Sequence, residues 1–203
     1  MENKSSDLLP NDILTIPNLL TGLRILLLPV FTILFLKEKY KISLVVFLIC
    51  GASDFLDGYL ARRLNSRSRL GSYLDPVADH GSVILIYIML TFSSGLPFQI
   101  PLALFILIAV RDLLVGVSEL GVLKFQGLDK TWDPIYSGKV AINTQFISAC
   151  VVVIANIYPR FFRDNLNVML VAVYIITGVF TLYSGLQYLN RGLDFWREKR
   201  RKE

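Results

Sequence analysis

Charged and titratable residues are scarce in this chain of 203 residues. Charged residues make up 18% of it, and it has one histidine and two cysteines. Cys50 and Cys150 lie inside apolar runs without CxxC or metal-ligand spacing, which indicates buried thiols that act as small hydrophobic side chains. No internal repeat or glycine-rich phosphate loop occurs. A soluble domain normally carries more charge and fewer apolar residues than the 54% found here.

Long apolar runs dominate the chain instead. A helix needs about 20 mostly apolar residues to cross the hydrocarbon layer. The segments that meet this requirement are roughly 17–36, 42–60, 74–92, 99–123, 139–159 and 166–190. The sequence therefore predicts an all-α integral membrane bundle of about six transmembrane helices. We expect an interfacial N-terminal segment over 1–16, a six-helix membrane domain over 17–192 and a basic cytoplasmic tail over 193–203.

The basic residues indicate the orientation of the bundle. The N-terminal segment does not resemble a cleavable signal, because acids accompany Lys4 and no small-residue cleavage site follows the first apolar run. If the N-terminus is cytoplasmic, the inside segments hold fourteen basic residues and the outside loops hold five. This asymmetry favours both chain ends inside. The inside cations suit an anionic lipid surface, so the net charge of +5 requires no nucleic-acid partner.

Four aspartates form two regularly spaced pairs. Asp54 and Asp57 are spaced i,i+3 and Asp75 and Asp79 are spaced i,i+4, so each pair projects from one helix face. An antiparallel helix pair would bring all four carboxylates together, where they repel one another unless a cation binds. Oxygen ligands favour Mg²⁺, Mn²⁺ or Ca²⁺ over zinc. The sequence predicts a divalent metal site, and the plainer alternatives are a proton relay or acids that face water.

The residues between the two pairs suit a nucleotide diphosphate. Gly58 and Ala61 are small and lie beside Asp57, which leaves room for a flat ligand against the backbone. Arg62, one turn on, can reach a phosphate, and Gly71 removes bulk before the second pair. Metal-assisted activation of a pyrophosphate is the chemistry that such a site performs.

The whole run resembles the motif of the CDP-alcohol phosphotransferase family. Its eight defining positions are all present, as Asp54, Asp57, Gly58, Ala61, Arg62, Gly71, Asp75 and Asp79. The resemblance implies a homodimer of six-helix subunits in the lipid bilayer, with a site for two Mg²⁺ or Mn²⁺ ions that opens to the cytoplasm. It also implies phospholipid biosynthesis from CDP-diacylglycerol.

The resemblance implies a role for each matching residue. Asp54, Asp57 and Asp75 would hold the metals, and Asp79 would be both a shared ligand and the general base that takes the proton of the attacking hydroxyl. Displacement at the β-phosphate would then release CMP. The CDP-lipid site would be lined by Asn18, Thr21, Gly58, Ala61, Arg62, Ser68 and Gly71.

The acceptor alcohol is less well marked. Several other stretches of the chain resemble the phosphatidylglycerophosphate synthase and cardiolipin synthase branch. They are IPNLLTGLRILLLP near the start, the Arg111–Asp112 pair, the run SGKV at 137–140, Gln145 and the run TLYSGLQYL at 181–189. Glycerol 3-phosphate needs cations for its phosphate, and Arg111 and Lys139 are the candidates, with Arg24 a weaker one. The structural alternative pairs Arg111 with an acid inside the bundle, Asp112 or Glu119.

Four positions depart from the synthase pattern. Ala141 and Ile142 stand where a lysine and a threonine are usual, and Glu119 replaces a second arginine. Fewer cations favour cardiolipin synthase, whose acceptor is phosphatidylglycerol, although glycerol 3-phosphate stays the first choice. His80 replaces a frequent lysine, and we expect a polar residue beside the site rather than a second base.

Two other classes of protein use similar residues. Membrane prenyltransferases also pair two aspartate-rich motifs around Mg²⁺ and a pyrophosphate, but they leave the small residues and Arg62 unexplained. An ion or proton transporter would explain Arg111 and the acids, but it would place acids nearer the bilayer centre. The compact size and the lack of an organelle-targeting presequence favour a bacterial inner membrane.

Overall fold

The chain is entirely helical in the part that the structure describes. The structure is a computed structural model, and it describes residues 16–63, 69–126, 136–165 and 167–202. The helices are α1 (Ile16–Leu36), α2 (Tyr40–Arg63), α3 (Arg69–Phe92), α4 (Leu102–Gln126), α5 (Tyr136–Ile157), α6 (Pro159–Asn165) and α7 (Asn167–Lys202). The all-α prediction is therefore confirmed.

The long helices follow the apolar runs of the sequence. The first predicted segment, 17–36, differs from α1 by a single residue, because backbone hydrogen bonding follows the apolar run closely. The short helix α6 was not predicted and lies between the last two expected segments. Helix α7 continues to Lys202, so the backbone of the predicted tail from 193 extends the last helix. Most of the predicted interfacial segment falls outside the described residues.

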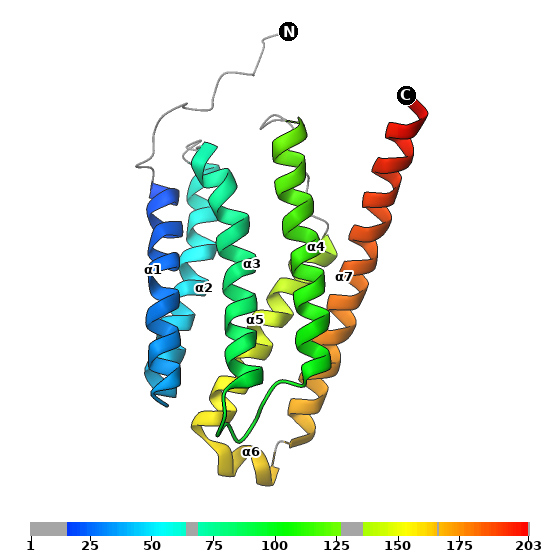
Figure 1. The fold of residues 1–203 in the computed structure, drawn as a ribbon. Helices are drawn as coiled ribbons and strands as arrows, with labels where there is room; N and C mark the ends of the chain where they lie inside the picture. Colours follow the sequence, from blue (N-terminus) through cyan, green and yellow to red (C-terminus); the bar gives the residue numbers. More distant parts are fainter. Residues whose placement is uncertain (1–15, 64–68, 127–135, 166, 203) are drawn as a thin grey trace.

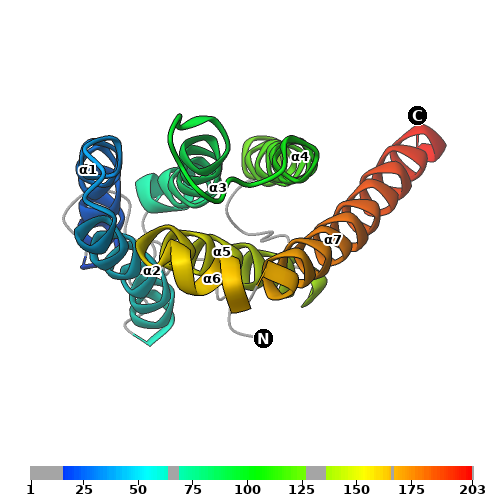
Figure 2. The ribbon, with the colours of Figure 1, turned by 90° about the horizontal axis from the view of Figure 1, so that it is seen from below.

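Successive long helices run in alternating directions across the bundle (Figure 1). The chain reverses between α2 and α3, so the end of α2 lies at the same end of the bundle as the start of α3. We call this end, where α1 also starts and α4 and α7 finish, the motif end. Helix α5 packs against α2, α3 and α7, and the view along the bundle shows it between α2 and α7 (Figure 2).

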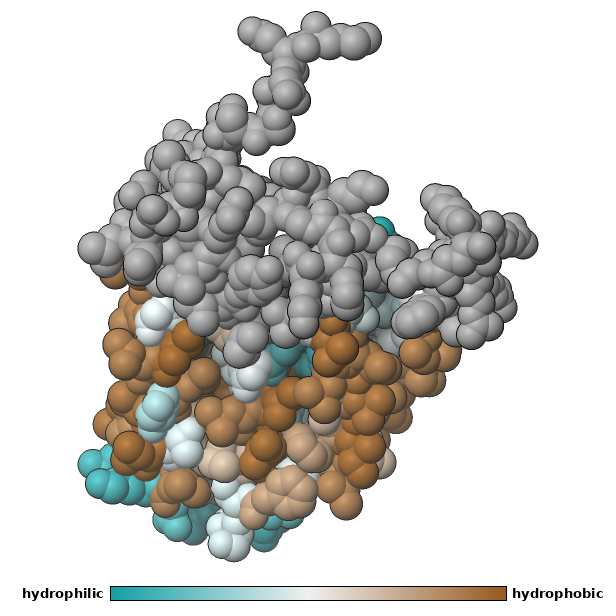
Figure 3. Space-filling model, turned by 45° about the horizontal axis from the view of Figure 1, so that its top comes forward, coloured by the Kyte–Doolittle hydropathy of each residue, from teal (hydrophilic) through white to brown (hydrophobic). Residues whose placement is uncertain are grey.

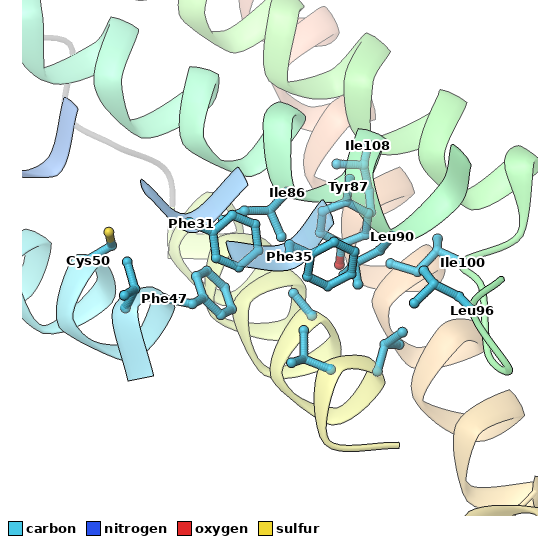
Figure 4. Close-up of a cluster of buried hydrophobic side chains, with 14 of the residues drawn as sticks. Phe31, Phe35, Phe47, Cys50, Ile86, Tyr87, Leu90, Leu96, Ile100 and Ile108 are labelled. Atoms are coloured by element: carbon cyan, nitrogen blue, oxygen red, sulfur yellow. The ribbon is translucent and has the colours of Figure 1, made fainter. Parts of the chain in front are cut away.

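Figure 4 shows a cluster of buried hydrophobic side chains that includes several aromatic rings. Its rings come from the second halves of α1 and α3 and the first half of α2, so the cluster lies in the half of the bundle away from the motif end. Phe31 and Phe35 of α1 stack with ring centroids 5.6 Å apart, and Phe47 of α2 lies 5.9 Å from Phe31. Tyr87 and Leu90 of α3 are buried against them. Burial of such rings contributes both apolar area and ring contacts, which fix how α1, α2 and α3 pack.

The outer surface of the bundle is apolar. Large side chains such as Leu26 on α1 (71% exposed) and Val168 on α7 (84% exposed) point away from the core. Hydrophobic residues cover most of the coloured face in the space-filling view (Figure 3). Exposed apolar area this extensive indicates contact with lipid rather than water.

Three helices of the described part are long and apolar enough to cross a membrane. They span Leu19–Leu36, Tyr136–Ile157 and Val168–Gly192, and shorter apolar stretches cover Tyr40–Ser53 and Ala78–Phe92. Helix α4 has the required length but carries Arg111 and Asp112. The chain is thus a helical membrane protein, and the number of six crossings stays a prediction.

Candidate functional site

The predicted metal and CDP-lipid residues lie on helices that meet at the motif end. The last turns of α2 hold Asp54, Asp57, Gly58, Ala61 and Arg62. The first turns of α3 hold Gly71, Asp75 and Asp79, and the first turns of α1 hold Asn18 and Thr21. Ser68 falls outside the described residues, as do the side chains of all the others except Thr21 and Asp79. The backbone therefore brings the two halves of the motif to one end of the bundle.

Asp79 forms an ion pair with Arg24. The Arg24 side chain, which comes from α1 and is 3% exposed, donates from Nη1 to Oδ1 of Asp79, whose side chain is 42% exposed. A buried guanidinium requires a partner of this kind. The sequence predicts Arg24 only as a weaker acceptor cation. The sequence feature that indicates its role is a lone arginine in an apolar run, and Arg111 has the same feature.

A cavity of about 120 Å³ adjoins this pair. Four helices build it: Arg24 comes from α1, Asp79 and His80 from α3, Gly51 from α2, and the rest of the wall from α2, α3 and α5. The remaining lining residues are Phe47, Cys50, Ser82, Val83, Ile86, Tyr87, Ile142, Gln145, Phe146 and Ala149. Its lining is therefore polar around Asp79 and mostly apolar elsewhere.

One wall of the cavity depends on Gly51. A Cβ atom at this position would lie 2.4 Å from a ring carbon of Phe146 on α5, a distance that no real contact has. Phe146 in turn packs on Phe47, with ring centroids 4.7 Å apart. The absence of a side chain at Gly51 lets the Phe146 ring rest on the α2 backbone. The contact between Phe146 and Gly51 therefore closes the cavity wall between α2 and α5.

His80 follows Asp79 on α3 and also lines the cavity. It is buried, with 9% of its surface exposed, and its ring faces Gly116 of α4, where an added Cβ would come within 3.2 Å of the imidazole. The expectation of a polar residue beside the site agrees with this position. Its chemical role stays a prediction.

Arg111 is the centre of a buried polar cluster between α4, α5 and α7. Its Nη1 donates to Oδ1 of Asp112 at 2.7 Å, and its Nε and Nη2 donate to Oγ of Ser184 at 3.3 and 3.0 Å. Nη2 also donates to the carbonyl of Gly138 at 3.3 Å, and the guanidinium carbon lies 5.7 Å from the centroid of the Tyr188 ring. This is the structural pairing that the sequence left open as an alternative, and Asp112 is the acid.

Lys139, the other predicted acceptor cation, follows Gly138 in the first turn of α5 and is exposed. The turn itself is tied down, because Ser137 donates to Oε1 of Gln187 on α7 and Gly138 contacts Arg111. The two predicted acceptor cations therefore differ in exposure. The Arg111 guanidinium is buried and hydrogen-bonded inside the protein, whereas the Lys139 side chain is exposed and accessible to a ligand. Acceptor binding by either residue stays a prediction.

The donor chemistry at the motif end fits a divalent cation. Three of the four aspartate side chains lie outside the described part, and within it no three His, Cys, Asp or Glu side chains gather around one point. Asp79 nevertheless has a partly exposed carboxylate, which forms an ion pair with Arg24. Carboxylate oxygens are the ligands that Mg²⁺ and Mn²⁺ prefer. Asp54, Asp57, Asp75 and Asp79 are the residues that would hold it.

Comparison with known proteins agrees with the family resemblance of the aspartate run. The family model described as CDP-alcohol phosphatidyltransferase matches residues 14–183. A CDP-diacylglycerol–glycerol-3-phosphate 3-phosphatidyltransferase from Pseudomonas fluorescens is 37% identical over 196 residues, covering 94% of this chain and 96% of the relative. A protein of the same name from Aquifex aeolicus is 32% identical and covers 88% and 96%. Human cardiolipin synthase (CMP-forming) is 31% identical over 191 residues, covering 88% of this chain and 62% of that protein.

Proposed function

Because the chain belongs to the CDP-alcohol phosphatidyltransferase family, we propose that it transfers a phosphatidyl group from CDP-diacylglycerol to glycerol 3-phosphate and releases CMP. The relatives from Pseudomonas fluorescens and Aquifex aeolicus, which this chain matches almost from end to end, carry this activity in their names. The product is phosphatidylglycerophosphate, so the protein acts in phospholipid biosynthesis.

The position of Asp79 carries the proposal. Its carboxylate is 42% exposed, lines the cavity and accepts a hydrogen bond from a buried arginine. A general base needs this combination, because it must reach the substrate while its orientation is fixed. A divalent cation held by the four aspartates would neutralise the pyrophosphate and stabilise CMP as the leaving group.

The residues of the chain then act on the substrates as follows. The acceptor oxygen forms a bond to the β-phosphorus of CDP-diacylglycerol as the bond from that phosphorus to the CMP oxygen breaks, and Asp79 accepts the hydroxyl proton. Arg24 orients the Asp79 carboxylate by donating to Oδ1. Asn18, Thr21 and the small residues of α2 hold the CDP end, and Lys139 attracts the acceptor phosphate.

The charge asymmetry of the sequence supports a motif end that faces the cytoplasm. Both chain ends then lie on that side, in a bacterial inner membrane, where soluble glycerol 3-phosphate reaches the cavity from water. The bacterial relatives are in keeping with this location. We also propose a homodimer, with Mg²⁺ or Mn²⁺ at each active site.

A direct assay tests the proposed reaction. Purified protein is mixed with CDP-diacylglycerol, glycerol 3-phosphate and Mg²⁺ or Mn²⁺, and CMP release is measured. We expect turnover that is lost when the metal is chelated and in Asp79→Asn. Glu38→Gln, an exposed acid between α1 and α2 at the other end of the bundle, is the matched control and should keep full activity. Full turnover of Asp79→Asn contradicts the base assignment.

Cardiolipin synthesis is the second candidate function. Ala141 is fully buried, Ile142 presents an apolar side chain to the cavity, and Arg111 is held by Asp112 and Ser184. These three observations leave few cations for a free phosphate and favour a lipid acceptor. Phosphatidylglycerol in the same assay separates the two functions, because a cardiolipin synthase releases CMP with it and not with glycerol 3-phosphate.

A further inference from the structure

Gln145 has a polar atom that the surrounding helices do not satisfy. The residue lies on α5, is fully buried and lines the cavity beside Asp79. Its Nε2 donates to Oγ1 of Thr181 on α7 at 3.3 Å, while Oε1 has no hydrogen-bond partner among the described residues. A buried carbonyl oxygen without a donor is costly and uncommon in native proteins. Its presence in the wall of a cavity points to a donor on a ligand.

The surroundings of Gln145 fix the direction of its side chain. The hydroxyl of Tyr87 on α3 donates to the backbone carbonyl of Gln145 at 3.0 Å, which holds this part of α5 against α3. Thr181 engages one end of the side-chain amide, so the other end is the one left for a ligand. An amide fixed in this way discriminates between ligands that have a matching hydroxyl and ligands that lack it.

The cavity limits what such a ligand can be. Its volume of about 120 Å³ is close to that of the roughly 150 Å³ protein cavity that holds one benzene molecule, which has six heavy atoms. A glycerol unit also has six heavy atoms, so its size matches this volume. Asp79 on α3 and Gln145 on α5 both line this one cavity.

We propose that Gln145 is a specificity-determining residue that accepts a hydrogen bond from the middle hydroxyl of the acceptor's glycerol unit. The inference rests on the proposed function, since Asp79 acts on the terminal hydroxyl of the same unit. Glycerol 3-phosphate and phosphatidylglycerol share this glycerol chemistry. Gln145 therefore recognises the polyol, and other residues distinguish the free phosphate from the lipid ester.

The test compares an acceptor with its analogue that lacks the middle hydroxyl, 1,3-propanediol monophosphate. We expect the wild-type protein to prefer glycerol 3-phosphate by about tenfold or more in kcat/KM, the value of one well-placed hydrogen bond in a buried site. In Gln145→Met, which keeps the length of the side chain but removes the amide, the preference should fall to less than about twofold. The KM for CDP-diacylglycerol should not change.

Ser148→Ala is the matched control. Ser148 is another fully buried polar residue of α5, one turn further on, and it is not among the residues that line the cavity. This variant should keep the wild-type preference. If Gln145→Met fails to fold, Gln145→Asn serves instead, because it keeps the amide but withdraws it by one methylene and must also reduce the preference.

An unchanged preference in the Gln145 variants, or an equal loss with both acceptors, overturns the inference. That result differs from a failure of the proposed function, which is the absence of CMP release by the wild-type protein with glycerol 3-phosphate. If the wild-type protein uses phosphatidylglycerol instead, the same ratio is measured with phosphatidylglycerol and its analogue without the middle headgroup hydroxyl. The inference then stands or falls on that ratio.

Discussion

Replacing Arg111 with methionine should destabilise the protein strongly. Arg111 and Asp112 are 2% and 0% exposed, and their side chains are 2.7 Å apart. Methionine fills much of the same volume but leaves the Asp112 carboxylate buried without its cation, and Oδ2 of Asp112 has no other hydrogen-bond partner among the described residues. Removing one partner of a buried ion pair costs about 3–5 kcal/mol. We expect a loss of this size in the free energy of unfolding.

Removing both charges should cost much less. In the double variant Arg111→Met with Asp112→Leu, no unpaired charge remains, and replacement of a buried ion pair by apolar residues is often neutral or stabilising. The two single variants and the double variant form a cycle that isolates the coupling energy of the pair. Unfolding by SDS titration of the purified protein in detergent, followed by circular dichroism, measures each free energy.

Two results would refute this reasoning. One is a loss below about 1 kcal/mol for Arg111→Met, because such a value is typical of exposed ion pairs. The other is a double variant no more stable than Arg111→Met alone. The same double variant also tests whether Arg111 binds the acceptor. Loss of a direct phosphate contact should raise the KM for glycerol 3-phosphate more than about tenfold. Such a rise in a double variant that still folds shows that Arg111 binds the acceptor as well.

Three further predictions concern contacts around the site. Gly51→Ala should push the Phe146 ring away from the α2 backbone and lower kcat/KM, as measured by CMP release. The added change Phe146→Leu should restore part of the activity. An unchanged kcat/KM in Gly51→Ala contradicts the packing of Phe146 on Gly51. Arg24→Gln should lower kcat by about tenfold or more, because Asp79 loses the charged donor that orients it, and Arg24→Lys should recover part of that loss. Gly138→Ala, whose new Cβ would lie 3.0 Å from the Tyr188 hydroxyl and 3.3 Å from Nη2 of Arg111, should lower the free energy of unfolding by about 1 kcal/mol in the SDS titration. An unchanged free energy would show that the cluster adapts freely.

The position of the candidate site could be predicted because its signals are local. The aspartate pairs are spaced at three and four residues and flank one chain reversal, so helix geometry alone carries them to one end of a bundle. The same holds for Thr21, which lies in the first turns of α1 at that end. The family resemblance rests on this one run, and the match over residues 14–183 confirms it.

The partners of the buried arginines could not be predicted in the same way. Arg24 meets Asp79 across 55 positions of sequence, and Arg111 meets Ser184 across 73. Burial of a charge in an apolar helix requires a partner, but it does not say which helix supplies it. For Arg111 the sequence left Asp112 and Glu119 open as structural partners, and the structure pairs it with Asp112, the adjacent residue.

The sequence by itself determined the class of the molecule and the extent of most helices, and it places the four predicted metal-binding aspartates on two of these helices. Each of these follows from backbone hydrogen bonds within one helix or from the length of an apolar run. Only the tertiary structure decided which faces meet: the Phe146 ring on Gly51, the ion pair of Asp79 and the cavity that Gln145 lines. In a membrane helix the faces toward lipid and toward neighbouring helices are both apolar, so the hydrophobic pattern does not fix the rotation of the helix.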